Sequence, residues 1–199
     1  MELRGISALT RRVAVGSAHG RFQPLHNGHM EYLLAAKSRC EFLWVGVTQY
    51  IASALHSSAA DPHRAEPMNN PLTYFERAQL ISRALTEARV SPSEFGIIPF
   101  PIEEPDLLEE FLPRSVPVFT TIYDRWNRHK LALLQALGYN VHVLWERDDS
   151  QKTYRGTVIR ELIATGTDST WQSQVPPATV ELVDELQLRQ RLRRLRSQG

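Results

Sequence analysis

The chain has 199 residues, 42% of them hydrophobic and 23% charged, which is typical of one folded globular domain and excludes a disordered chain. Its formal net charge of +1 excludes the broad basic surface that duplex nucleic acid requires, so we expect no nucleic-acid partner and only local anion sites. The single Cys40 cannot form an internal disulfide, residues 1–10 lack the apolar core of a signal peptide, and no apolar run is long enough to span a membrane, so we expect a cytoplasmic protein with no membrane partner.

The first predicted unit is a strand, a tight turn and a helix. An apolar run at 13–15 leads into Gly20-Arg21-Phe22-Gln23-Pro24-Leu25-His26-Asn27-Gly28-His29 and then into helix-forming residues at 30–36. A helix start offers unpaired N–H groups and the positive end of its dipole to an anion, and glycine lets the backbone approach a phosphate closely. His26 and His29 fall on one side of the first turn and can aim two ring N–H donors at one anion. The turn is therefore a candidate phosphate site, although a lone histidine is more often a surface or core residue.

Further strand-like runs at 42–48, 95–100, 116–122 and 139–145 alternate with helix-like segments, which favours an α/β fold with a parallel sheet. The polar segment from Gln49 to Asn70 shows no clear period. We expect a mobile loop there, either a lid or a substrate-binding loop, because loops of this length are commonly functional.

Two helices are expected in the middle of the chain. The first begins after Asn70-Pro71-Leu72-Thr73 and carries an apolar stripe through Leu80, Ile81, Ala84 and Leu85. The second begins within Tyr123-Asp124-Arg125-Trp126-Asn127, at the end of the fourth strand, and Gly138 ends it.

A second loop-to-helix junction follows the fifth strand, at Tyr154-Arg155-Gly156-Thr157-Val158-Ile159-Arg160. It brings a glycine, a hydroxyl and an arginine into one turn, although Thr at a helix start is usually only a cap. From Pro176 onward the pattern predicts a helix with a basic end between Arg189 and Arg196. Arginine there complements the helix dipole, so we expect a docked helix with a solvated basic end; contact with RNA or an acidic partner is the alternative.

These segments resemble a known family. Gly-x-Phe-x-Pro-x-His-x-Gly-His at 20–29 resembles the first signature of the HxGH nucleotidyltransferase superfamily, the cytidylyltransferase-like proteins, and Arg-Phe-Gln-Pro is the form seen in its nicotinamide-nucleotide adenylyltransferase branch. Residues 70–77 are similar to the family's Asn-Pro-x-(Thr/Ser)-x-x-Glu-Arg segment, and residues 154–160 to its second signature, Ser-(Ser/Gly)-Thr-x-Ile-Arg. Leu25 and Arg155 depart from it, since Phe and Ser are common at those positions.

The resemblance implies a Rossmann-like, doubly wound parallel sheet of about five strands in the order 3-2-1-4-5, in a single domain over residues 1–199. The core would lie at about 12–165, with a C-terminal helical extension at about 170–199. It also implies a triphosphate site in which the catalytic residues are His26, His29 and Arg160, and the nucleotide or its phosphates contact Gly20, Arg21, Phe22, Gly28, Gly156 and Thr157. In this family the residue at Arg77 helps to hold substrate near the phosphates; a surface arginine paired with Glu76 is the alternative.

The acceptor side matches less well. The nicotinamide branch has an aromatic residue, commonly Trp, shortly after the third strand, and residues 102–108 contain none. Trp126 is a candidate replacement, with core packing as the alternative, and Gln49, Tyr123 and Asp124 complete the predicted substrate-binding set.

The activity that the resemblance implies is transfer of a nucleoside monophosphate. Our first expectation is transfer of AMP from ATP to nicotinamide mononucleotide, giving NAD and pyrophosphate, with Mg²⁺ bound by the substrate phosphates and no metal site in the protein. A cytidylyltransferase that uses CTP and a phosphorylated or phosphonate small molecule is the main alternative. A non-catalytic, nucleotide-binding regulatory protein is the second, and a homo-oligomer is left open.

Overall fold

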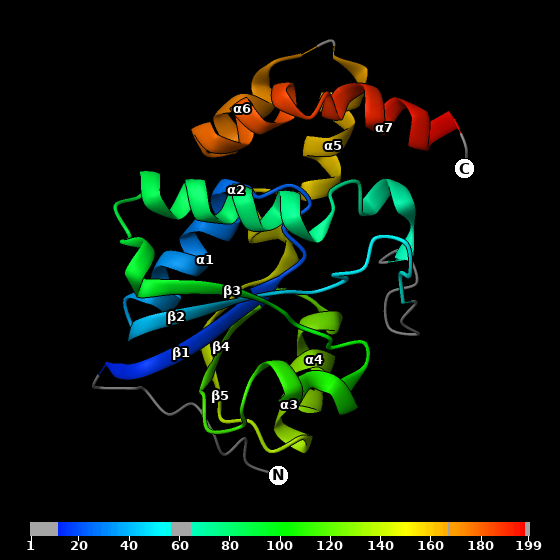
Figure 1. Cartoon of the computed structure of the whole chain (residues 1–199). Helices are drawn as coiled ribbons and strands as arrows, with labels where there is room; N and C mark the ends of the chain where they lie inside the picture. The colour runs from blue at the N-terminus through cyan, green and yellow to red at the C-terminus, as the bar shows by residue number, and fades with distance from the viewer. Residues whose placement is uncertain (1–11, 57–64, 167, 198–199) are drawn as a thin grey trace.

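A single parallel sheet forms the centre of the protein, and its strands lie in the order β3-β2-β1-β4-β5 (Figure 1). The computed structural model describes residues 12–56, 65–166 and 168–197. The strands are β1 (Val13–Gly20), β2 (Cys40–Val47), β3 (Phe95–Pro99), β4 (Val118–Ile122) and β5 (Val141–Glu146). Both the α/β class and the predicted strand order are confirmed.

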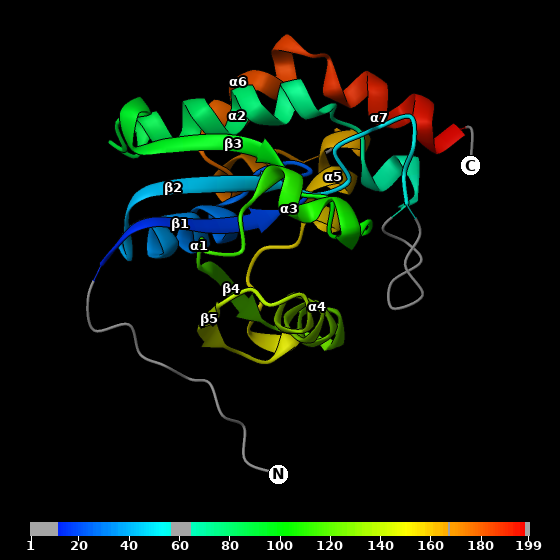
Figure 2. The same cartoon turned by 60° about the horizontal axis from the view of Figure 1, so that its bottom comes forward.

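Helices cover both faces of the sheet. Against one face lie α1 (Asn27–Lys37) and α2 (Tyr74–Glu87), followed outward by α5 (Gly156–Thr165), α6 (Pro177–Glu185) and α7 (Leu188–Ser197). Against the other lie α3 (Leu108–Phe111) and α4 (Arg125–Ala136). Short 3-10 turns occupy 67–69, 92–94, 105–107, 149–151 and 170–174. Figure 2 shows α6 lying along α2 on the side away from the sheet, and α7 running on past the start of α2.

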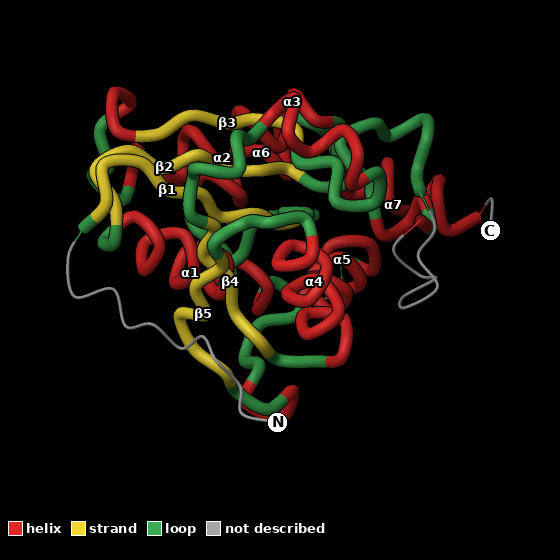
Figure 3. The backbone as a smooth tube through the Cα atoms, turned by 90° about the horizontal axis from the view of Figure 1, so that it is seen from below, coloured by secondary structure: helices red, strands yellow, loops and turns green. Residues whose placement is uncertain are grey.

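The sheet opens between β1 and β4. Only Ser17 and Ala18 of β1 pair with β4, whereas β1 pairs with β2 from Val13 to Gly20. Figure 3 shows β4 and β5 running at a steep angle to the other three strands. Gly16 permits the close approach at this junction, since a Cβ there would lie 2.4 Å from the Phe119 ring. The chain reverses its direction of winding here, so the carboxyl ends of β1 and β4 leave a crevice at which ligands bind in such folds.

The elements differ from the sequence predictions in two places. β1 extends beyond its apolar run to Gly20, because the small and polar residues 16–20 pair with β2 at the sheet centre. The predicted C-terminal helices are confirmed, but they do not form one unbroken helix from Pro176: α6 and α7 are separate, and the break falls at Gln187, whose φ is +50°.

The predicted loop from Gln49 to Asn70 contains no regular element among its described residues except the 3-10 turn at 67–69. Residues 57–64 lie outside the described part, so the proposed lid stays a prediction. No helix in the described ranges is long and apolar enough to cross a membrane.

Candidate active site

The turn between β1 and α1 is anchored to the segment before α2. The side-chain amide of Gln23 donates to the carbonyl of Leu72 at 2.8 Å and accepts from the Leu72 N–H at 2.9 Å, so it pairs with that backbone as a neighbouring strand would. Phe22 precedes it in the left-handed region, with φ of +53°, and its ring is fully buried. A bulky residue adopts this conformation only where its surroundings enforce it. The backbone of the phosphate-site turn is therefore fixed by packing and by Leu72.

His26 and His29 form the first turn of α1 and cap it reciprocally. The His29 N–H donates to Nδ1 of His26 at 3.2 Å, and the His26 N–H donates to Nδ1 of His29 at 3.4 Å. Their rings stack at a centroid distance of 3.6 Å. Gly28 leaves room for the stack, because a Cβ there would lie 3.3 Å from the His26 ring and from Tyr154.

This arrangement sets the protonation of both rings. Burial lowers the pKa of His26 from 6.5 to about 3, with the charge of Lys152 acting in the same direction. Burial also holds the pKa of His29 well below its ordinary value, with further lowering by His26 and Lys152. Both imidazoles are thus neutral at pH 7, and because each Nδ1 accepts a hydrogen bond, the ring proton is on Nε2. The pair can therefore present two neutral N–H donors to the cavity, while the predicted contact of both donors with one anion stays a prediction.

Arg160 lies opposite, on the first turns of α5. Its guanidinium donates to the carbonyl of Gln23 at 2.6 Å, to Oγ1 of Thr157 at 3.2 Å and to Oδ1 of Asn69. Burial lowers the pKa of Arg160 to about 10, partly offset by Glu66, so the side chain keeps its charge at neutral pH. A buried cation therefore lines the same cavity as the two histidines, and its charge contributes to the lowered pKa of His26.

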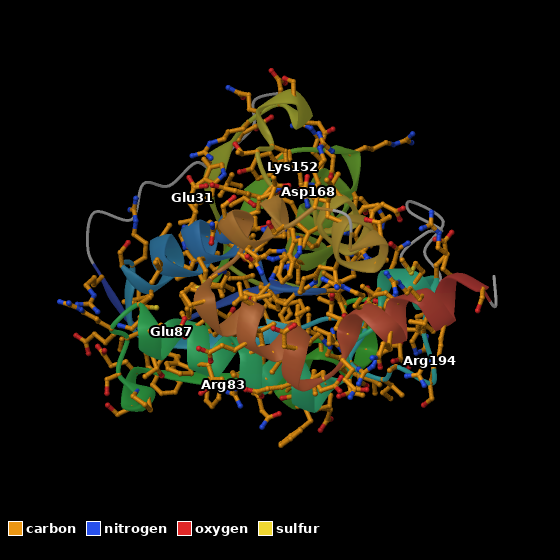
Figure 4. The ribbon with its side chains drawn as sticks, turned by 90° about the horizontal axis from the view of Figure 1, so that it is seen from above. Glu31, Arg83, Glu87, Lys152, Asp168 and Arg194 are labelled. Atoms are coloured by element: carbon orange, nitrogen blue, oxygen red, sulfur yellow. The ribbon has the colours of Figure 1, made fainter. Side chains whose placement is uncertain are left out.

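Lys152 adds a second cation beside the histidines. Its ammonium lies 3.8 Å from Asp124 and 5.7 Å above the Tyr123 ring, and its label in Figure 4 places it in the loop before α5. Asp124 itself caps α4, accepting from the Asn127 N–H at 2.8 Å. The helix starts of α1, α4 and α5 thus converge on one space.

That space is a cavity of about 500 Å³ at the carboxyl ends of β1, β4 and β5, within the usual range for small-molecule sites. It brings together most residues predicted from sequence: Gly20, Arg21, Phe22, His26, Gly28, His29, Tyr123, Asp124, Trp126, Gly156, Thr157 and Arg160.

The profile of the cytidylyltransferase-like family matches residues 17–162, a range that includes both signature turns. The chain belongs to this family. A phosphonoformate cytidylyltransferase of Streptomyces viridochromogenes is 42% identical to it over 89% of the chain and 95% of that protein. A nicotinamide-nucleotide adenylyltransferase of Ignicoccus hospitalis is 32% identical over 88% of the chain and 94% of that protein. The chain is therefore a nucleotidyltransferase, and the superfamily inferred from its signatures is confirmed.

Solved structures show that the fold is shared. A bifunctional NMN adenylyltransferase/ADP ribose pyrophosphatase of Francisella tularensis, solved with AMP and a Mn ion, matches 90% of the chain with a TM-score of 0.65 at 14% identity. The chain spans about half of that longer protein, 52% of its length. A likeness at this identity shows the Rossmann-like fold alone.

Two predicted substrate-binding residues of this family member lie elsewhere. Gln49 is absent from the cavity lining, and its amide is bonded to the backbone of His56 at 2.6 and 3.0 Å. Arg77 is also absent from the lining and is completely buried. Its guanidinium donates to carbonyls at the ends of β1 and β2 and before α2, those of Arg21, Thr48, Gln49 and Thr73, at 2.7–3.2 Å. Arg77 therefore holds together the backbone segments beneath the cavity. Its position matches neither the predicted contact with substrate nor the alternative of a surface arginine paired with Glu76.

Other cavity residues were missed by the sequence reasoning. Lys152, Lys130, Trp145 and Arg147 all line the cavity. Arg147 pairs with Glu31 of α1 at 2.8 Å and lies 4.7 Å from the Trp145 ring centroid, which ties β5 to α1. The one available signal was position, since 145–147 lie at the carboxyl end of β5 and Lys152 stands two residues before the second signature.

Among the described residues, no group of three or more His, Cys, Asp or Glu could hold a metal ion. A Mg²⁺ ion carried by a triphosphate needs no such cage, because substrate oxygens and water supply most of its ligands.

Proposed function

We propose that this nucleotidyltransferase transfers CMP from CTP to a small phosphonate or phosphorylated acceptor and releases pyrophosphate. The observation that carries the choice of CTP is the 42% identity to a phosphonoformate cytidylyltransferase along almost the whole of both chains. It reverses the order of the two activities expected from the signatures, where ATP came first. The cavity supports a small acceptor, since about 500 Å³ must receive both a nucleoside triphosphate and the acceptor.

The reaction requires position and positive charge more than proton transfer. An acceptor oxygen that is already anionic attacks the α-phosphorus, the bond from that phosphorus to the bridging oxygen breaks, and pyrophosphate leaves with the electron pair. The acceptor gives up no proton, so the site needs no general base, and the neutral pair His26 and His29 is suited to donate hydrogen bonds instead.

Each wall of the cavity has its own proposed role. The Nε2–H groups of His26 and His29 would stabilise the charge that develops on the α-phosphate and the bridging oxygen. Arg160, Thr157 and the N–H groups at the start of α5 would bind the β- and γ-phosphates, with Lys152 between the two sides. Arg21 would contact the acceptor phosphate. Mg²⁺ bound by the phosphates would neutralise further charge.

A second candidate is adenylyl transfer from ATP to nicotinamide mononucleotide. It is favoured by the 32% identity to a nicotinamide-nucleotide adenylyltransferase and by the indoles of Trp126 and Trp145 in the cavity lining, which could stack on a pyridine or a base. A non-catalytic role is disfavoured, because the phosphate-contacting residues predicted from the signatures are all present and together.

Pyrophosphate release measured over a matrix of substrates tests these alternatives. CTP, ATP, GTP and UTP would each be combined with phosphonoformate, nicotinamide mononucleotide and no acceptor, in the presence of Mg²⁺. We expect the highest kcat/KM with CTP and phosphonoformate. A preference for ATP and the mononucleotide would replace the proposal with the second candidate, and nucleotide binding without release in any pair would support the regulatory role.

A further inference from the structure

Arg160 is fixed in the cavity wall by two separate loops. The carbonyl of Gln23 comes from the turn after β1, and Oδ1 of Asn69 comes from the segment before α2. With these contacts Arg160 is only 3% exposed, and its position depends on where both loops lie. The first loop is fixed internally, since Phe22 and Leu25 are completely buried.

The second loop is bound from outside by α7. Arg191 donates to the carbonyl of Pro71 at 2.9 Å and makes a two-point pair with Glu76, at 2.7 and 2.8 Å. Glu76 in turn accepts from the Thr73 N–H at 2.8 Å and so caps α2. Burial alone would raise the pKa of Glu76, but the hydrogen bonds from Arg191 and Thr73 outweigh it and hold that pKa below its usual value. The pair is thus ionised and only partly exposed, which makes it stronger than an ordinary surface ion pair.

The same helix also contacts the far end of α5. Arg189 donates to the carbonyl of Ile163 at 3.2 Å, and Arg193 donates to those of Ala164 and Thr165 at 2.7 and 3.0 Å. These carbonyls belong to the last turn of α5, where the helix dipole favours a cation. The basic end of the tail is therefore not simply solvated, and α7 lies against both α5, which carries Arg160, and the loop that contacts Arg160 (Figure 1).

We infer that Arg191 is a positioning residue for Arg160. It fixes residues 69–73 against α2, so that Asn69 and Leu72 orient Arg160 and the Gln23 turn toward the phosphates. The inference rests on the phosphate-binding role proposed above for Arg160. It assigns the C-terminal helix a part in triphosphate binding although none of its residues lines the cavity.

The test is the dissociation constant for CTP, measured by calorimetry on the full chain with Arg191→Met. We expect that constant to rise about tenfold, because a displacement well under the size of an atom weakens aligned charged contacts strongly. Arg194→Met is the matched control, since Arg194 is an exposed arginine on the same helix, labelled in Figure 4, and its change should leave binding as in the wild type. Thermal unfolding of both variants shows whether they are folded at the assay temperature.

A double variant separates positioning from general weakening. Asn69→Ala removes the contact to Arg160 while leaving Arg191 and Glu76 in place. If Arg191 acts through this loop, Arg191→Met should weaken CTP binding much less in the Asn69→Ala background than in the wild type. Equal losses in both backgrounds, or unchanged binding in folded Arg191→Met, would overturn the inference.

Should Arg191→Met not fold, Glu76→Gln tests the same link with a smaller change, and unchanged CTP binding in it would also overturn the inference. The readout is nucleotide binding and involves no acceptor. Failure of the proposed reaction, seen as no pyrophosphate release by the wild type, is therefore distinguishable from failure of the role assigned to Arg191.

Discussion

His26 and His29 each accept, at Nδ1, a hydrogen bond from the backbone N–H of the other, at 3.2 and 3.4 Å. The two hydrogen bonds that cap α1 therefore also fix the orientation of the two imidazole rings. Because the backbone of the first turn fixes both tautomers, the two Nε2–H groups are preorganised donors, and neither ring has to reorient to donate a hydrogen bond.

His29→Ala should lower kcat by about 100-fold or more, the typical cost of removing one aligned donor to a developing charge. His26→Asn retains a side-chain acceptor for the cap and separates loss of the ring donor from loss of the helix start. Single-turnover rates with CTP would be compared between these variants and the wild type. Near-normal turnover by a folded His29→Ala protein would falsify the assignment of this residue.

The depressed histidine pKa values predict a loss of stability in acid. The unfolded chain binds a proton at His26 below pH 6.5, whereas the native protein binds it only near pH 3, so the free energy of unfolding falls as pH drops through this window. For His26 the loss at pH 5 should be about 2 kcal/mol relative to pH 7. Urea unfolding at both pH values measures it, and His26→Asn should show a smaller difference. An identical pH dependence in wild type and variant would mean that His26 is not buried in its neutral form.

The α/β class could be predicted from the sequence because the patterns that decide it are local: apolar strands, the helix after the His26 turn and the junction at Gly156 all depend on residues close in the chain. The order of the strands in the sheet was implied by the family resemblance, since the alternation of strands and helices does not determine it. The break between α6 and α7, in contrast, could not be predicted from residues close to it in the chain. Gln187 is neither Gly nor Pro, yet it adopts a φ of +50° because α6 packs on α2 while α7 turns toward α5.

The residues of the two signature turns could be predicted from the sequence, whereas the other residues around the candidate site could not. His26 and Arg160 belong to motifs whose spacing carries a mechanism. The partners of Arg77 are carbonyls as far as 56 residues away, and no pattern around position 77 indicates which backbone it meets. Lys152 contacts Asp124 and Tyr123 in the cavity, and these belong to another strand connection, so no pattern around position 152 indicates the contact.

Lys152→Met should reduce kcat/KM by roughly 10- to 100-fold, the equivalent of a charge-assisted hydrogen bond of about 1.5–3 kcal/mol. The physical reason is the loss of a cation beside His26 and His29, where the transferred phosphate is expected to lie. It should also raise the pKa of both histidines, since the charge of Lys152 lowers them in the wild type. Steady-state kinetics and histidine NMR titrations measure the two effects. Lys152→Arg keeps the charge and should retain most of the activity; equal losses in Met and Arg variants would point to shape rather than charge.

Arg77→Met should act on stability. The guanidinium is completely buried and donates to backbone carbonyls from three separate segments, so its removal takes away four charge-assisted hydrogen bonds at once. Each such hydrogen bond contributes about 1.5–3 kcal/mol, so the free energy of unfolding should fall by roughly 3 kcal/mol or more. Arg83→Met, on the same helix but exposed and paired with Glu185 at its surface, should change stability far less. Urea unfolding compares the two variants, and CTP titration follows at a temperature where both are folded.

If Arg77→Met kept wild-type stability and lost only affinity for CTP, Arg77 would be a binding residue after all. A loss of stability in which the remaining native protein still binds CTP would establish Arg77 as the structural support beneath Thr48 and the Gly20 turn.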